Sequence, residues 1–271
     1  MSLAARNLLR PLFMLLMLLL VALLSLQLYF VARIALMAVL PPESTAFQRS
    51  EIFRVVGRTG SLQWRQSWVP YAQISVNLKR AVIASEDASF TEHDGLDLEA
   101  LEKAWGKNVV AEQRAQKLAD RLAADAAKRQ ANKKNSAAPE PLKFVAKAPK
   151  IIGGSTITQQ LAKNLFLSGE RTLLRKGEEL LLTLMLEAML NKQRILEIYL
   201  NNVEWGEGIF GAEAAAQHYF RKPAARLSPY EAARLAVMLP RPRYFETRPN
   251  SEYLASRANT IVARMGGVDV P

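Results

Sequence analysis

Near its start the chain carries an uncharged apolar run, Leu12 to Ala32, in which only Ser25 and Gln27 are polar. As a helix with a rise of about 1.5 Å per residue, this run is about 30 Å long, which matches the hydrocarbon core of a bilayer. A secretory signal has a shorter apolar region and a small-x-small cleavage site, and neither is clear here. The run therefore predicts a retained transmembrane helix over residues 12–32 rather than a buried helix of a soluble core.

The flanks of this run indicate how the chain is oriented. Arg6 and Arg10 precede the run and favour a cytoplasmic N-terminus for residues 1–11, although Arg33 on the far side weakens the bias. The bulk of the chain is then expected outside. Residues 33–70 form a membrane-proximal segment, in which apolar Ile34–Leu40 is expected along the membrane surface before Pro41 and Pro42 break it.

Charge and rare residues limit the function classes. The net charge is +11, which points to a polyanionic partner such as anionic lipid, a diphosphate or nucleic acid. The chain has no cysteine and two histidines. A disulfide framework, a thiolate metal site and most histidine-built metal sites are therefore excluded, and cysteine usage leaves the compartment undecided.

The rest of the chain is predicted to be mainly helical. An apolar stretch from Ile74 to Val82 predicts a helix that ends at Glu86, and Asp97 is a plausible N-cap for the next helix. Leu180–Leu190 is almost wholly apolar and predicts a buried central helix, in which Glu187 is the one charge to be accounted for. No run of alternating strands is present, so the soluble part is expected to be mainly α-helical.

The segment from Gly153 to Asn164 has the pattern of a glycine loop that leads into a helix. Thr156 and Gln159 form a capping-box start, and a helix start offers unpaired N–H groups and a positive dipole end. The helix is expected to bury Ile157, Leu161 and Leu165 and to present Gln160, Lys163 and Asn164 on another face. The segment predicts a site for an anionic or sugar-like ligand, or else an ordinary amphipathic helix with a wet polar face.

Residues 107–150 are basic and rich in alanine. They contain eleven lysines and arginines against four acids, which accounts for about +7 of the net charge. The first half is expected to be a solvated basic helix, and Asn132–Pro149 has the composition of a flexible linker. This region could lie on anionic headgroups, or it could be a solvated loop.

Five segments in order resemble the motifs of the family 51 glycosyltransferases, the peptidoglycan transglycosylases: Glu86–Gly95, Gly153–Asn164, Arg175–Glu179, Lys192–Asn201 and Gly211–Pro240. The resemblance implies a lysozyme-like glycosyltransferase domain in residues 71–271. It implies that lipid II is polymerised into β-1,4 glycan with release of undecaprenyl diphosphate. Family members join the first two motifs by a shorter link, so residues 107–150 read as an insertion. No Ser-x-x-Lys motif is present, which favours the monofunctional form of the enzyme.

The resemblance also assigns roles to residues. Glu86, at the end of an apolar helix, is the candidate general base, and Glu179 is the second essential carboxylate. A single displacement on an α-linked donor predicts inversion. Lys163, Arg171 and Lys176 are expected to hold the donor diphosphate, although Arg175 or Lys176 with Glu179 could also be an ordinary helical ion pair. The remaining predicted substrate-binding residues are Asp87, His93, Ser155, Thr156, Gln159, Gln160, Asn164 and Arg175.

The implied surroundings are those of a cell-wall enzyme. We expect the bacterial cytoplasmic (inner) membrane, a single pass and a periplasmic catalytic domain. The partners would be lipid II, the growing lipid-linked strand, the membrane and proteins of wall synthesis or division, without nucleic acid. No cofactor is expected to be obligatory, and a divalent cation, Mg²⁺ or Mn²⁺, could assist at Glu179.

Two rival classes remain open. A lytic enzyme of similar fold would cleave glycan with one main acid, and would not need the cationic residues of a diphosphate site. A membrane-anchored basic binding protein would explain the charge and the anchor, but not the two glutamates. Glu86→Gln separates these readings, because a binding protein would tolerate it and a transferase would not.

Overall fold

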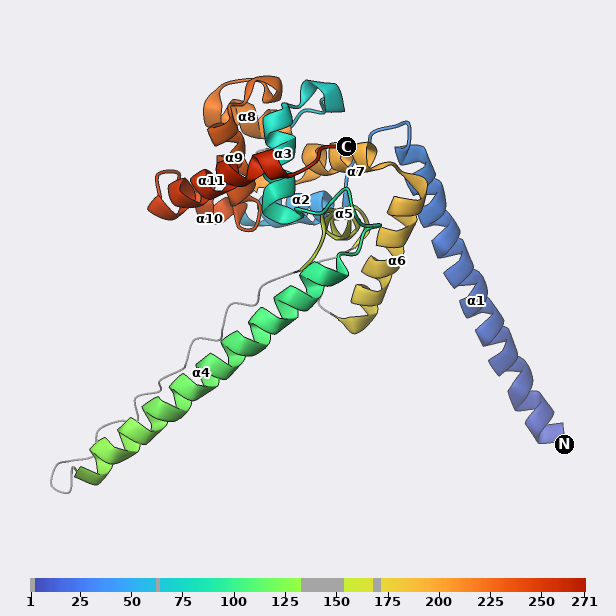
Figure 1. The fold of residues 1–271 in the computed structure, drawn as a ribbon. Helices are drawn as coiled ribbons and strands as arrows, with labels where there is room; N and C mark the ends of the chain where they lie inside the picture. The colour runs from blue at the N-terminus through green and yellow to red at the C-terminus, as the bar shows by residue number, and fades with distance from the viewer. Residues whose placement is uncertain (1–2, 62–63, 133–153, 168–171) are drawn as a thin grey trace. The chain divides into compact units, whose positions relative to one another are not determined.

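The computed structural model describes residues 3–61, 64–132, 154–167 and 172–271, and the described chain is mainly helical (Figure 1). Its α-helices are α1 (Leu3–Met37), α2 (Ala46–Thr59), α3 (Val76–Glu86), α4 (Leu98–Asn132), α5 (Ile157–Phe166), α6 (Leu173–Met189), α7 (Lys192–Asn202), α8 (Ala212–Phe220), α9 (Pro229–Met238), α10 (Pro242–Glu246) and α11 (Glu252–Arg264). Short 3-10 helices lie at η1 (Tyr71–Gln73), η2 (Ala224–Arg226) and η3 (Met265–Gly267). The chain divides into two compact units, Met1–Leu96 with Thr156–Pro271, and Asp97–Ser155.

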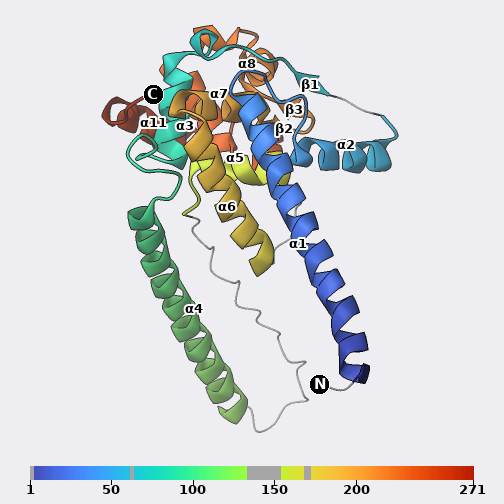
Figure 2. The ribbon, with the colours of Figure 1, turned by 90° about the vertical axis from the view of Figure 1, so that its right-hand side faces the viewer.

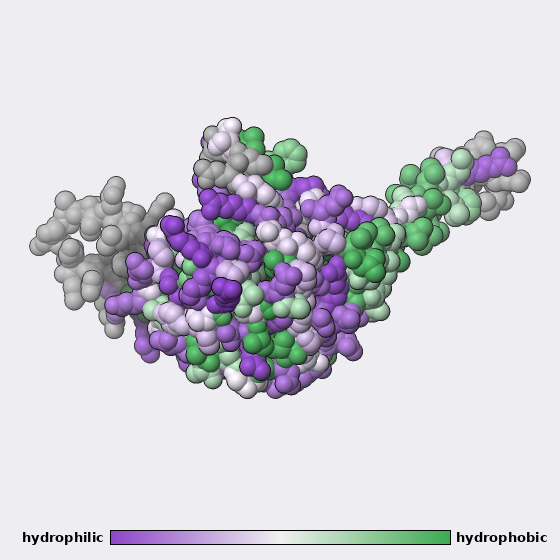
Figure 3. All heavy atoms as spheres, turned by 90° about the horizontal axis from the view of Figure 1, so that it is seen from above, coloured by the Kyte–Doolittle hydropathy of each residue, from purple (hydrophilic) through white to green (hydrophobic). Residues whose placement is uncertain are grey.

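Helix α1 contains a stretch, Arg10–Met37, that is long and apolar enough to cross a membrane. The helix continues past the predicted end at Ala32, so Ile34 to Met37 extend it instead of lying separately along the membrane surface. Ile34 and Met37 are buried, because the last turns of α1 pack into the core of their unit. The earlier turns protrude and present a largely hydrophobic surface (Figure 3).

Helix α6 lies beside α1 (Figures 1 and 2) and differs from its predicted form. Leu182 and Leu186 are fully buried, as expected of a central helix. The predicted burial holds for this face alone, because Leu181 and Leu184 are more than two-fifths exposed. Periodicity cannot assign a buried face when every face is apolar, and α6 buries only one of them.

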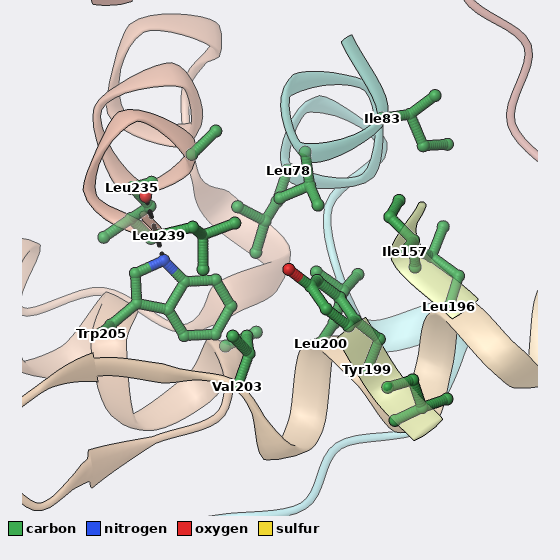
Figure 4. Close-up of a cluster of buried hydrophobic side chains, with 14 of the residues drawn as sticks. Leu78, Ile83, Ile157, Leu196, Tyr199, Leu200, Val203, Trp205, Leu235 and Leu239 are labelled. Carbon is green, nitrogen blue, oxygen red and sulfur yellow. Dashed lines mark hydrogen bonds between the residues drawn. The ribbon is translucent and has the colours of Figure 1, made fainter. Parts of the chain in front are cut away.

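The core of the larger unit is built where α3, α9 and α11 pack together and where α5 packs against α6 and α7. Trp205 is fully buried in this core, and its indole N–H donates to the Leu235 carbonyl at 3.0 Å (Figure 4). Capping residues define the helix starts: Ser228 and Glu231 form a capping box on α9, as the Ser-Pro-x-Glu pattern favours.

A small sheet was not expected from the sequence. Its strands are β1 (Arg65–Gln66), β2 (Glu204–Gly206) and β3 (Ile209–Phe210), in the order β1-β3-β2. β1 runs parallel to β3, and β2 runs antiparallel to it. Strands of this length contain too few residues to show an alternating pattern, so the prediction of a mainly helical domain stands without them.

In the smaller unit, α4 begins directly after Asp97, whose Oδ1 accepts from the Ala100 backbone N–H at 2.7 Å. The predicted N-cap is therefore correct. The helix continues without a break through Lys107 and is mostly exposed, in agreement with the expected solvated helix. The predicted linker after Asn132 lies outside the described residues.

Candidate active site

Glu86 is the last residue of α3, where the sequence predicted it. Ser75 caps the start of this helix, and its buried face includes Leu78 and Val82. Two neutral donors hold the Glu86 carboxylate: Gln160 Nε2 donates to Oε2 at 3.1 Å, and Ser85 Oγ donates to Oε1 at 3.3 Å. An apolar helix thus ends in one carboxylate that accepts hydrogen bonds from a hydroxyl and an amide group.

The surroundings of Glu86 adjust its basicity. Burial raises the pKa of this carboxyl above its ordinary value, and the hydrogen bonds from Gln160 and Ser85 oppose that rise. The positive charge of Arg257 also lowers the pKa, whereas the neighbouring charge of Asp87 raises it. A carboxylate whose pKa is moved toward neutrality is suited to accept a proton in a reaction.

Asp87 and His93 form the framework next to Glu86. Asp87 Oδ2 accepts from the Ile157 N–H at 2.9 Å, and Oδ1 lies 2.9 Å from His93 Nε2. The Gly95 N–H donates to His93 Nδ1 at 3.1 Å, so the ring proton belongs on Nε2, where it is donated to Asp87. Both residues use these polar atoms inside the protein, which describes a framework role, and their predicted contact with substrate stays a prediction.

Thr156 and Gln159 have a similar role at the start of α5. The expected capping box is present, with Thr156 Oγ1 accepting from the Gln159 N–H and Gln159 Oε1 accepting from the Thr156 N–H. Thr156 Oγ1 also donates to the Gly95 carbonyl at 2.7 Å. Both side chains are buried, and Thr156 joins the start of α5 to the loop after Glu86. Their predicted contact with substrate stays a prediction.

The outer face of α5 retains polar groups. Gln160 contacts Glu86, and Lys163 and Asn164 follow it at three and four residues, so the three share one face. Lys163 is exposed and Asn164 is half-buried. Ser155 is exposed at the end of the smaller unit.

Glu179 is the second predicted carboxylate, and it is buried on α6. Arg175 NH1 donates to its Oε2 at 2.9 Å, and Lys176 Nζ contacts its Oε1. Arg175 and Lys176 thus both form the ion pair with Glu179 that their spacing on the helix allowed. The Lys176 side chain remains 51% exposed, so its ammonium can meet a further anion. Arg171 lies outside the described residues.

Sequence reasoning missed the partner of Glu187. Lys192 Nζ donates to Glu187 Oε1 at 2.8 Å and to the His93 carbonyl at 2.5 Å, and Thr158 Oγ1 donates to the same Glu187 oxygen at 2.6 Å. This cluster ties α6, α7 and α5 to the loop after Glu86. Glu187, as the lone charge in an apolar stretch, indicated that a charged partner existed. The sequence could not identify Lys192 as that partner, because the pairing depends on tertiary packing.

Tyr199 was also missed, since it was not among the predicted site residues. Its hydroxyl donates to Gln160 Oε1 at 2.9 Å, and Gln160 in turn donates to Glu86. Gln160 alone therefore links Tyr199 to Glu86 in this chain of hydrogen bonds. No signal in the sequence distinguishes this tyrosine from an ordinary core aromatic residue.

The chain is similar in sequence to known proteins of one family. A model of the protein family described as Transglycosylase matches residues 53–133 and 141–266. Relatives named "Biosynthetic peptidoglycan transglycosylase" include one from Burkholderia thailandensis, which is 48% identical over 92% of this chain and 83% of its own length. Another, from Herminiimonas arsenicoxydans, is 46% identical over 92% of each chain.

Proposed function

Because the chain belongs to the transglycosylase family of peptidoglycan glycosyltransferases, we propose that it polymerises lipid II into β-1,4-linked glycan strands and releases undecaprenyl diphosphate. The helix α1, which is long and apolar enough to cross a membrane, agrees with an enzyme whose substrate is held in a bilayer by its lipid. The proposal places the catalytic domain on the periplasmic side, as Arg6 and Arg10 before the apolar run favour.

The observation that carries this proposal is the environment of Glu86. Its carboxylate is partly buried, receives hydrogen bonds from Gln160 and Ser85, and has a pKa that burial raises. In the proposed step, Glu86 takes the proton from the 4-hydroxyl of the acceptor sugar as that oxygen attacks the anomeric carbon of the donor. The bond from this carbon to the diphosphate breaks, the electron pair leaves with the diphosphate, and the configuration is inverted.

The diphosphate requires positioned cations. In the proposal Lys163, Arg171 and Lys176 hold the phosphates and Asn164 lies beside the donor. Ser155 stays a predicted substrate-binding residue. Lys176 is exposed enough to meet a phosphate while it contacts Glu179, and Arg175 fixes the other oxygen of Glu179. Arginine and lysine groups stabilise the charge that develops on such a leaving group.

A divalent cation has no step in this proposal. Both oxygens of Glu179 contact cationic side chains, Arg175 and Lys176. These cations compete with Mg²⁺ or Mn²⁺ for the carboxylate oxygens that such a metal would need. We expect polymerisation to continue when divalent cations are chelated, which is measured by adding EDTA to the assay. Abolition of activity by EDTA, with recovery on adding Mg²⁺, would show that a metal takes part.

The decisive experiment replaces the base. Purified protein in detergent is given labelled lipid-linked disaccharide-pentapeptide, and the products are resolved by length. Glu86→Gln should lower the rate by about 10²- to 10⁴-fold, which corresponds to about 3–5 kcal/mol of barrier. The matched control is Glu92→Gln, the same change in the same loop at an exposed side chain, which should keep the wild-type rate.

The same assay separates the rival functions. A binding protein would make no polymer and would tolerate Glu86→Gln, and a lytic enzyme would shorten glycan instead of extending it. Isolation of a covalent glycosyl-enzyme intermediate would contradict the inverting displacement.

Proteins of wall synthesis or division are the protein partners that this activity suggests.

A further inference from the structure

We propose that Tyr199 is a positioning residue for catalysis, whose hydroxyl fixes the side-chain amide of Gln160 so that this amide holds the Glu86 carboxylate. The inference rests on the proposed function, because it concerns the group that we assign as the base. It gives a role in the reaction to a residue of α7 that is far from Glu86 in the sequence and does not contact it directly.

Three helices contribute one polar group each to a continuous chain. From α7, Tyr199 OH donates to Gln160 Oε1 at 2.9 Å, and from α5, Gln160 Nε2 donates to Glu86 Oε2 at 3.1 Å. Tyr199 is 1% exposed and lies in the buried cluster that includes Leu78 and Leu200 (Figure 4). Bulk water therefore cannot take the place of the bond from Tyr199 to Gln160.

The direction of the two bonds follows from their chemistry. Burial, together with the negative charges of Glu86 and Asp87, raises the pKa of Tyr199 well above its ordinary value, so its hydroxyl remains a donor. A donor selects the oxygen end of the Gln160 amide, which turns the NH₂ end toward Glu86. The reverse orientation would place the amide oxygen against a carboxylate, where neither group can donate.

This arrangement favours the ionised form of Glu86. The hydrogen bond from Gln160 lowers the pKa of Glu86, which burial raises, and the ionised form is the one that can act as a base. Other groups act on Glu86 as well: Ser85 and Arg257, from α3 and α11, lower its pKa, and Asp87 raises it. A change at Tyr199 leaves these three in place, so it isolates the contribution of the amide.

The test is Tyr199→Phe, which keeps the ring and removes only the hydroxyl. We expect the acidic limb of the pH–rate profile to move to higher pH, with the rate at the acidic end about 2- to 10-fold lower, the effect of one lost hydrogen bond. At high pH the rate should recover, and KM for the lipid-linked donor should not change. Tyr219→Phe is the matched control, because its hydroxyl donates to the Trp205 carbonyl at 2.7 Å and does not reach Glu86.

A second variant keeps the inference testable if the phenylalanine disturbs packing. Gln160→Met removes the amide, and Tyr199→Phe should then have no further effect on the profile, since the hydroxyl acts through Gln160. Additive effects, or a Tyr199→Phe profile that superimposes on those of the wild type and Tyr219→Phe, would overturn the inference. If Glu86→Gln retains full activity, the proposed function fails instead, whatever Tyr199→Phe does.

Discussion

Glu204 is a buried carboxylate outside the candidate site, on β2. It shares the guanidinium of Arg243 with Glu51: Arg243 Nε donates to a Glu204 oxygen at 2.9 Å and NH2 contacts Glu51. Burial raises the pKa of Glu204 to about 7, and the charge of Glu51 adds to this rise while Arg243 opposes it. Residues of this kind make folding sensitive to pH near neutrality.

The sign of this effect follows from linkage. A carboxyl whose pKa is raised in the folded state binds a proton more tightly there, so its contribution to stability is present below pH 4.5 and is lost as pH rises through about 7. We expect Glu204→Gln to flatten the fall in melting temperature between these pH values. The control Glu207→Gln, at a carboxyl whose pKa is lowered, should keep the wild-type slope, and an unchanged slope in Glu204→Gln would contradict the prediction.

Among the elements, the loop after α3 depends on a close approach to α6. Gly95 has φ +84°, and a Cβ there would lie 2.7 Å from Thr183 Cγ2 and 2.9 Å from Glu187 Cγ. Gly95→Ala should therefore destabilise the protein by at least about 1–3 kcal/mol, since both the backbone and the neighbours must shift. Urea unfolding measures this loss.

The matched control is also a glycine-to-alanine change. Gly177 lies within α6, and a Cβ there would meet nothing within 4 Å. Gly177→Ala should therefore leave stability equal or raise it by up to about 1 kcal/mol, because alanine is the better helix former. A Gly95→Ala variant as stable as Gly177→Ala would show that the loop tolerates the side chain and that Gly95 is not required there.

The elements also show how far sequence alone reaches. The capping boxes at Thr156 and Ser228, the N-cap at Asp97 and the position of Glu86 were predictable, because they depend on neighbours three or four residues away. The links from Tyr199 to Gln160 and from Lys192 to Glu187 and the His93 carbonyl were not. The first and the last of these bonds join residues 39 and 99 positions apart, and the exposed face of α6 likewise depends on what packs against it.

At the scale of the larger unit, α1 and α6 together offer an apolar surface. Leu173 and Leu174, at the start of α6, are 94% and 86% exposed, and α6 lies beside α1. Exposed leucines next to a candidate membrane span are stable when lipid covers them. We therefore expect the start of α6 to enter the bilayer.

The absence of cysteine makes this prediction direct to test. A fluorophore attached at Leu173→Cys should be quenched by lipids that carry a spin label in their acyl chains when the protein is in vesicles. The control Tyr253→Cys labels an exposed position on α11, where no quenching is expected. Equal quenching at the two positions would contradict the immersion of α6.

The last turns of α1 have a consequence for how the protein is made. Arg194 Nε donates to the Met37 carbonyl at 2.7 Å across 157 residues of chain, and Met37 itself is part of the core. Translation at about 5–20 residues per second leaves on the order of ten to thirty seconds between the synthesis of these two residues. As a candidate membrane span, α1 is expected to be in lipid by then. We therefore expect the domain to complete its core against a helix that the bilayer already holds, at the membrane surface.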